Sequence, residues 1–242
     1  DLAKTLKKIS DIGYTAVQVS AVGAMNGEKP EVDGATMRKM LDDNGLTCIA
    51  THRPLDALLN NVDEEIEFHQ TLGCDYAAFG GIFGDDATNP DAYRKFIQDA
   101  ARVIPRYKAA GIRFGHHNHS HEFVRVERHG RTLEDMLIDE GGADLMLELD
   151  LYWVEHAGLN CVRLLERCPG RVPVIHLKDK EVVPVDGPVM APIGEGNMDW
   201  DYIIPACEAA GVRWYAIEQD TCRRDPFDCL KSSHDYLRSK GL

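Results

Sequence analysis

Four histidines, an asparagine and a glutamate lie within the nine residues 115–123 of this chain. The histidines are His116, His117, His119 and His121, and they follow a short run, 112–114, that is typical of the start of a strand. Imidazole and carboxylate groups together bind divalent metals, and imidazole also exchanges protons near neutral pH. The same composition would suit a solvated loop tip, so the rest of the chain must decide between the two interpretations.

Length and composition indicate one ordinary globular domain. The chain has 242 residues, of which 44% are hydrophobic and 28% charged, enough for a single core of the size of an α/β barrel. The formal net charge of −13 repels phosphate backbones, so we expect no nucleic-acid partner. We also expect no membrane partner, because no run is long and apolar enough to span a bilayer.

The seven cysteines indicate a reducing compartment. Their odd number and the lack of a CxxC pair argue against a disulfide framework, so we expect small buried thiols and a cytoplasmic location. No signal peptide is visible. The sequence opens inside a predicted helix, however, and is therefore also compatible with an N-terminal leader that has been removed.

One pattern recurs seven times along the chain: an amphipathic helix, a glycine, and a short apolar run that ends in polar residues. Glycine after a helix is a common left-handed cap, and helices alternating with short apolar runs favour parallel strands with helical crossovers. The predicted helices cover about 2–12, 35–44, 62–72, 90–110, 132–139, 160–168 and 200–210, and a last helix covers 226–240. The predicted strands cover 15–20, 47–52, 75–80, 112–119, 144–150, 172–178 and 214–220.

Seven such strands do not close a barrel, whereas eight do. Because the chain starts with a helix, the missing strand is expected before residue 1. We therefore predict a single domain over 1–242, a (β/α)8 TIM barrel lacking its first strand. A doubly wound open sheet is the alternative, and the absence of a GxGxxG turn after any strand argues against it. The longest irregular stretch, 181–198, follows the sixth strand and is predicted to be a functional loop.

Polar residues recur on one face of the predicted strands, near their C-terminal ends. Side chains alternate along a strand, so Glu148 and Asp150 point the same way, while leucines 145, 147 and 149 point toward the helices. Alternation places further polar residues on the inner face: Gln18, His52, His117, His119, His176, Lys178, Glu218 and Asp220. Burying so many ionisable groups unpaired would cost several kcal/mol each. A bound divalent cation would remove most of that cost, although for a single pair, such as Lys178 with Asp150, a plain ion pair is the simpler alternative.

At this point the sequence resembles a known family, the xylose isomerase-like barrels of the sugar phosphate isomerase/epimerase group. The resemblance covers nearly the whole chain in order. It rests on five motifs: His117-Asn118-His119-x-x-Glu122-Phe123, Leu149-Asp150-x-Tyr152-Trp153 with Ala157-Gly158, Gly170-Arg171-x-Pro173-x-x-His176-Leu177-Lys178-Asp179, Gly194-Glu195-Gly196-x-x-Asp199-Trp200, and Glu218-Gln219-Asp220.

The resemblance implies a divalent metal, Mn²⁺, Mg²⁺ or Zn²⁺, and a role for particular residues. Asp150, His176 and Glu218 match the ligands of the family. For the fourth ligand we expect Glu122, because many relatives carry a glutamate where this chain has His117. Gln18 also replaces a glutamate that many relatives carry. The expected substrate contacts are His52, Asn118, Trp153 and Asp220.

The implied activity is that of a sugar isomerase or epimerase. His119 or His117 would remove a proton beside a carbonyl, an enediolate would form under the charge of the metal, and Lys178 would steady the negative charge. A keto-sugar dehydratase or lyase of the same fold is the alternative. An endonuclease is disfavoured by the charge and by the single evident ligand set. A non-catalytic sugar-binding subunit would use its aromatic residues for stacking, although core packing is the simpler role for them. The expected partner is thus a small sugar or keto-sugar. The sequence is also compatible with a homo-oligomer.

Overall fold

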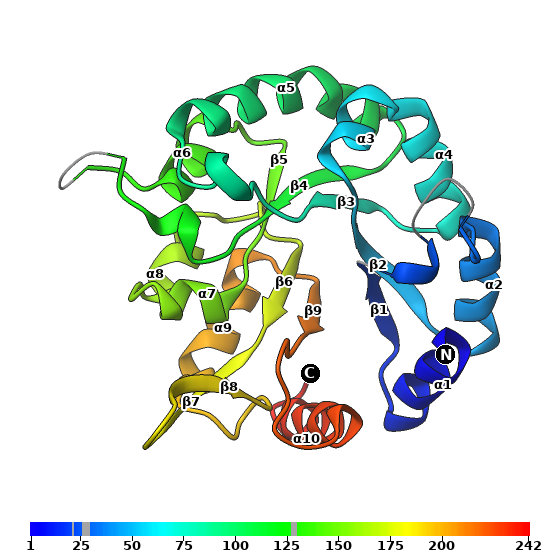
Figure 1. Ribbon diagram of the computed structural model, residues 1–242, viewed down its shortest axis with the longest axis vertical. Coiled ribbons are helices and arrows are strands. Elements are labelled where there is room, and N and C mark those ends of the chain that lie inside the picture. The colour runs from blue at the N-terminus through cyan, green and yellow to red at the C-terminus, as the bar shows by residue number, and fades with distance from the viewer. Residues whose placement is uncertain (21, 26–29, 127–129) are drawn as a thin grey trace.

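A computed structural model describes residues 1–20, 22–25, 30–126 and 130–242, and in it seven parallel strands converge at the centre of a ring of helices (Figure 1). The strands are β1 (Ala16–Val19), β2 (Thr47–His52), β3 (Tyr76–Phe79), β4 (Arg113–His117), β5 (Leu145–Glu148), β6 (Val174–Leu177) and β9 (Trp214–Ile217). Strands β1 to β5 pair in chain order, β6 pairs with β9, and a parallel bridge from Asp150 to His176 joins the two groups. Every predicted strand is present, and the fold is confirmed as a TIM barrel of the α/β class.

The eight predicted helices are present with similar bounds, and two short ones, α3 (Leu55–Asn60) and α7 (Leu151–His156), were not predicted. The eight are α1 (Leu2–Ile12), α2 (Gly34–Asp43), α4 (Val62–Leu72), α5 (Pro90–Ala109), α6 (Leu133–Glu140), α8 (Cys161–Leu165), α9 (Trp200–Ala210) and α10 (Pro226–Ser239). Short 3-10 turns occur at η1 (Gly23–Met25), η2 (Gly84–Asp86) and η3 (His121–Phe123). Gly73 and Gly211 end α4 and α9 in the left-handed conformation, as the glycine pattern predicts. None of the helices within the described ranges combines the length and the apolar character that crossing a membrane requires.

The main core lies between the strands and the helices around them. Leu145 and Leu147 of β5 and Ile175 and Leu177 of β6 are at most 1% exposed, and all belong to one large apolar cluster. These are the residues that alternation assigns to the helix side. The opposite faces of the same strands are therefore left for polar residues.

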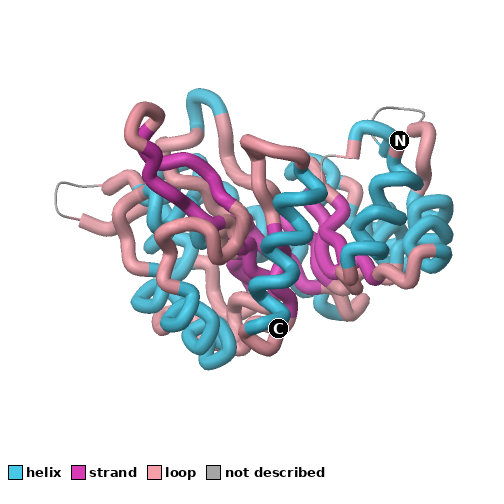
Figure 2. Tube along the Cα trace, turned by 90° about the horizontal axis from the view of Figure 1, so that it is seen from below, coloured by secondary structure: helices cyan, strands magenta, loops and turns pink. Residues whose placement is uncertain are grey.

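The strand order leaves β1 and β9 at the two edges of the sheet. Among the described residues no strand pairs with their outer edges, and a groove of about 430 Å³ separates them. Helix α10 lies across this side of the molecule (Figures 1 and 2) and is tied to the segment after α1 by a hydrogen bond of 2.8 Å from the Tyr14 hydroxyl to the Leu230 carbonyl. The groove occupies the place where an eighth strand would close the barrel, in agreement with the expectation of seven strands.

The stretch 181–198 is more regular than the sequence predicts. It contributes to an antiparallel hairpin of β7 (Asp179–Val183) and β8 (Gly187–Ala191), in which Gly187 turns the chain at φ 74°. After β8 the chain folds over the buried carboxylate of Asp179, which accepts hydrogen bonds from the N–H groups of Gly194, Gly196 and Met198 and from the Trp200 indole. A Cβ at Gly196 would lie 2.2 Å from Asp179 Oδ1, which explains the glycine there. The prediction of an irregular stretch was wrong because turn chemistry and one buried carboxylate order it.

Candidate metal and substrate site

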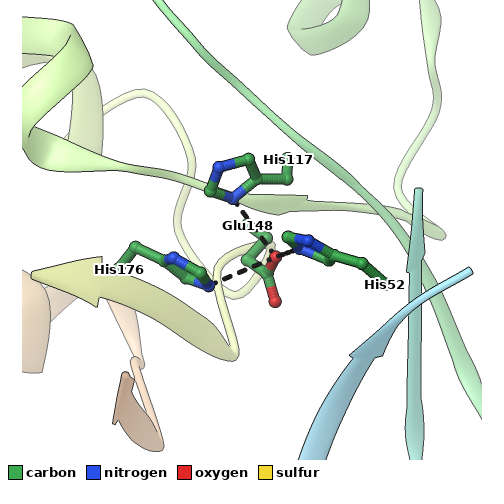
Figure 3. A group of neighbouring side chains, drawn as sticks. All are labelled: His52, His117, Glu148 and His176. Atoms are coloured by element: carbon green, nitrogen blue, oxygen red, sulfur yellow. Dashed lines mark hydrogen bonds and ion pairs between the residues drawn. The ribbon is translucent and has the colours of Figure 1, made fainter. Parts of the chain in front are cut away.

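Four of the inward-facing residues form a tight cluster at the C-terminal ends of the strands. They are His52, His117, Glu148 and His176, and one ligand atom of each lies within 4.8 Å of the others. The Oε2 atom of Glu148 lies 2.5 Å from His52 Nε2, 3.3 Å from His117 Nδ1 and 3.5 Å from His176 Nε2. Figure 3 shows the three imidazoles pointing at this carboxylate from three directions.

A second group shares His176 with the first. Asp150, His176 and Glu218 also place one ligand atom each within 4.8 Å of one another. His176 Nδ1 is 2.7 Å from Glu218 Oε2, while its Nε2 is 2.7 Å from the side-chain oxygen of Gln18. Burial alone would lower the pKa of His176, but the charges of Glu148 and Glu218 outweigh it and raise the pKa above the ordinary value.

A buried lysine of the site is shared by three carboxylates. Lys178 is 2% exposed, and its Nζ lies 3.0 Å from Asp150 Oδ2, 3.0 Å from Glu218 Oε2 and 3.1 Å from Asp220 Oδ2. Burial alone would lower the pKa of Lys178. The three negative charges outweigh burial and raise the pKa above its ordinary value, so the ammonium stays protonated. The ion pair of Lys178 with Asp150, weighed in the sequence as the simpler alternative, is therefore present. It coexists with the two groups of ligand atoms.

Asp150 is oriented by the helix that follows it. Its Oδ1 accepts the backbone N–H groups of Tyr152, at 3.0 Å, and Trp153, at 3.4 Å, and so caps α7. Burial raises the pKa of Asp150 to about 6. The backbone N–H of Asp150 in turn donates to Asn118 Oδ1 over 2.9 Å, which ties the end of β5 to the end of β4. Asn118, expected to contact substrate, thus holds Asp150 in place.

Glu148 Oε1, a buried atom of the first group, has no hydrogen-bond partner within the part of the chain that the structure describes. His117 Nδ1 makes no hydrogen bond there either, with Glu148 Oε2 3.3 Å away, and Asp150 Oδ2 is opposed by the Lys178 ammonium at 3.0 Å. Native interiors rarely leave buried polar atoms unsatisfied, so unpaired donors and acceptors here indicate a missing partner. Carboxylate oxygens and neutral imidazole nitrogens are ligands of Zn²⁺, Mn²⁺ and Mg²⁺, and the residues present therefore fit a divalent cation.

His119 lies at the edge of the cluster. The centres of its ring and that of His117 are 4.9 Å apart, and Trp153 is 5.9 Å away on another side. Burial lowers the pKa of His119 to about 4 and that of His117 well below its usual range. Both rings are therefore neutral near pH 7 and able to accept a proton.

Glu122 is not part of either ligand group in the described chain. It is fully buried in η3, where it contacts His121, Tyr93 and the backbone of His119. Its placement gives no support to the expectation that Glu122 is the fourth ligand. Most of the other predicted residues do gather, in two linked sets. His52, His117 and His176 meet at Glu148, while Asp150, Glu218 and Asp220 surround Lys178. The contact of His176 with Glu218 joins the two sets.

Sequence reasoning missed the central role of Glu148. The residue shares the inward face with Asp150, two positions on, so strand alternation did carry the signal. The motif that carries the family resemblance begins at Leu149 and therefore does not include Glu148. Gln18, placed on the inner face by alternation but given no role, also contacts the cluster, because its Nε2 donates to Glu148 Oε2 over 3.2 Å.

Comparison with known proteins agrees with this fold. The model of the xylose isomerase-like TIM barrel family matches residues 6–240, so this chain belongs to that family. No functionally curated protein sequence matches it.

Solved structures with the same fold include enzymes of two reaction types. A sugar phosphate isomerase/epimerase from Parabacteroides distasonis ATCC 8503 is 21% identical, with a TM-score of 0.82 over 99% of this chain and 90% of that one. An L-ribulose 3-epimerase is 17% identical, with a TM-score of 0.70 over 98% and 88%. The probable 3-DHS dehydratase AsbF, involved in petrobactin synthesis, from Bacillus anthracis is 12% identical, with a TM-score of 0.71 over 98% and 93%. At these identities the likeness establishes the fold.

Proposed function

We propose that this protein is a divalent-metal-dependent sugar isomerase or epimerase that moves a proton on a carbon next to a carbonyl. The observation that carries the proposal is the meeting of Asp150, His176 and Glu218 beside neutral histidines, with one oxygen of the neighbouring Glu148 left without a hydrogen bond among the described residues. Membership of the family and the sugar isomerase and epimerase among its structural neighbours support the same reaction class.

Asp150, His176 and Glu218 would hold the metal, and Glu148 is the fourth ligand that we favour. Glu148 is preferred because its Oε2 lies 3.5 Å from His176 Nε2 and its Oε1 has no hydrogen bond to any described residue. When bound, the metal would polarise the carbonyl of the sugar and so acidify the neighbouring C–H.

The side chains of the protein would do the remaining work. His119, neutral near pH 7, accepts the proton from carbon, and His117, 4.9 Å away between ring centres, is the second candidate. Lys178 keeps its charge because three carboxylates surround it, and it would oppose negative charge on the substrate oxygen. Trp153 borders His119 and would pack against the apolar face of the sugar.

A metal-dependent dehydratase or lyase of keto-sugars is the second candidate. It is favoured by the likeness to the probable dehydratase, and it would use the same first step, after which a β-substituent leaves. A nuclease activity gains one argument, because two overlapping ligand groups are present where the sequence indicated one. The net charge of −13 still opposes it, since phosphate backbones are repelled.

Exchange of solvent deuterium into sugars tests the proposal. The protein is stripped with a chelator, reloaded with Mn²⁺, Mg²⁺ or Zn²⁺, and incubated with a panel of ketoses and aldoses in D₂O. We expect metal-dependent deuterium incorporation at the carbon beside the carbonyl, with an epimer or isomer as product; a dehydrated product would select the second candidate. Glu218→Gln should reduce exchange at least 100-fold, whereas Glu208→Gln, on the exposed face of α9, serves as the control. Unchanged exchange in Glu218→Gln would refute the proposal.

A further inference from the structure

The turn that follows β4 is held by one buried carboxylate. Glu122 Oε2 accepts the backbone N–H of His119 over 2.7 Å. Its Oε1 lies 3.1 Å from His121 Nε2 and accepts the Tyr93 hydroxyl over 3.3 Å. With no exposed surface and contacts from three directions, this carboxylate has little freedom to move.

The residue before His119 is fixed as well. Asn118 is 1% exposed, and its Oδ1 accepts the backbone N–H of Asp150. The backbone at 118–119 is therefore tied to β5 on one side and to Glu122 on the other. Two such ties determine the direction in which the side chain of His119 leaves the chain.

By contrast, the ring of His119 has no such restraint. Its Nδ1 is buried without a hydrogen-bond partner among the residues described, and its neighbours are the rings of Phe83, His117, His121 and Trp153. Van der Waals contacts to rings leave the imidazole free to slide along them, so its position depends on the backbone beneath it. A shift of about 1 Å in a proton-transfer group can cost on the order of 100-fold in rate.

The charge on Glu122 strengthens this tie. Burial acts to raise its pKa, but the hydrogen bond of His121, the proximity of His116 and the N–H of His119 together lower the pKa below the ordinary value. The carboxylate is thus ionised near neutral pH, and an N–H group bound to an ionised acceptor is held more strongly than one bound to an amide.

We propose that Glu122 is a positioning residue, which holds His119 at the angle from which it reaches the substrate. This inference rests on the proposed role of His119 as the base. It assigns the conspicuous glutamate of the 117–123 motif to the control of geometry rather than to the metal.

A double-mutant cycle with Glu122→Gln and His119→Ala tests the proposal. We expect each single variant to lower kcat for deuterium exchange at least 10-fold with KM within about twofold, and the double variant to be no slower than His119→Ala alone. Glu134→Gln is the matched control, since it makes the same change in a fully buried glutamate that does not contact His119, and its kcat should equal that of the wild type. Losses that multiply in the double variant would overturn the proposal.

Two measurements distinguish the positioning role of Glu122 from a role as a metal ligand and from a role in stability alone. The metal content of Glu122→Gln should equal that of the wild type; a loss comparable to that of Glu218→Gln would make Glu122 a ligand and overturn the positioning role. In the metal-free protein, Glu122→Gln should shift the ring-proton NMR signals of His119 and leave those of His234, on α10, unchanged. Unmoved His119 signals would also overturn it.

An error in the proposed function can be told apart from an error in the role of Glu122. If His119→Ala exchanges deuterium as fast as the wild type, the base is wrong, whatever Glu122 does. If Glu122→Gln does not fold, as judged by circular dichroism, Tyr93→Phe removes one donor to the same carboxylate and should lower kcat two- to fivefold, again only when His119 is present.

Discussion

Glu134 should make the stability of this protein fall as the pH rises from 4.5 toward 8. The residue lies in the first turn of α6 and is 1% exposed, and its Oε2 has no hydrogen-bond partner among the described residues. Burial, followed by the negative charges of Glu122 and Asp135, raises its pKa to about 8. The carboxyl is therefore neutral in the folded protein at pH 7 and ionised in the unfolded chain.

The size and sign of the effect follow from these two pKa values. Below pH 4.5 both states are protonated and the full stability is present. Between pH 4.5 and about 8 only the unfolded chain releases the proton, so the free energy of unfolding falls by about 1.4 kcal/mol per pH unit, or roughly 3 kcal/mol by pH 7. Above about pH 8 the folded protein ionises too, and the loss is complete.

Urea denaturation of the metal-free wild type and of Glu134→Gln, at half-unit steps from pH 5 to 8, measures this term. Glutamine cannot ionise, so the difference between the two proteins cancels the titration of other groups. We expect the free energy of unfolding of Glu134→Gln, relative to that of the wild type, to rise by roughly 2–3 kcal/mol between pH 5 and 7. Glu140→Gln, exposed on the same helix, is the control and should show no such gain. Parallel curves for Glu134→Gln and the wild type, within about 0.5 kcal/mol, would refute the reasoning.

Three further predictions concern the site and its support. Asp179→Asn should lower the free energy of unfolding by about 2–4 kcal/mol, seen as a lower urea midpoint, because the carboxylate accepts several buried N–H groups; an unchanged midpoint would contradict this. Lys178→Met should destabilise the metal-free protein by about 3 kcal/mol, and added Mn²⁺ should raise its melting temperature more than that of the wild type, since three carboxylates lose their cation; equal shifts would count against it. Glu148→Gln should lose bound metal in elemental analysis, and full occupancy would exclude it as a ligand.

Strand alternation predicted most of the site. It placed His52, His176, Lys178 and Glu218 on one inner face from sequence alone, and the structure brings them together at the strand ends. The rule works here because a parallel strand in a barrel fixes each side chain to one of two faces. Alternation also places Glu148 on this face, but the motif that carries the family resemblance begins one residue later, at Leu149.

Where the chain leaves a strand, alternation gives no guidance. Asn118 and Glu122 follow β4 in a turn, and a turn can direct its side chains to either side of the sheet. Asn118 goes inward to the Asp150 backbone, whereas Glu122 goes to a separate set of partners that includes Tyr93 of α5. The ordered hairpin of β7 and β8 escaped prediction for a related reason, since its form depends on Asp179, whose partners lie 15 to 21 residues further on.

The two sides of β4 explain why composition could not choose between Glu122 and Glu148. Both carboxylates are fully buried, and each faces more than one imidazole. Adjacent residues His116 and His117 point to opposite faces, so the first approaches Glu122 at 3.8 Å and the second approaches Glu148 at 3.3 Å. The two carboxylates differ in their contacts. Glu148 lies beside His176, which also belongs to the group with Asp150 and Glu218. Glu122 instead contacts Tyr93, His121 and a backbone N–H. Both oxygens of Glu122 have donors, whereas Glu148 Oε1 has none among the described residues, so we favour Glu148 as the ligand and Glu122 as the residue that holds the turn.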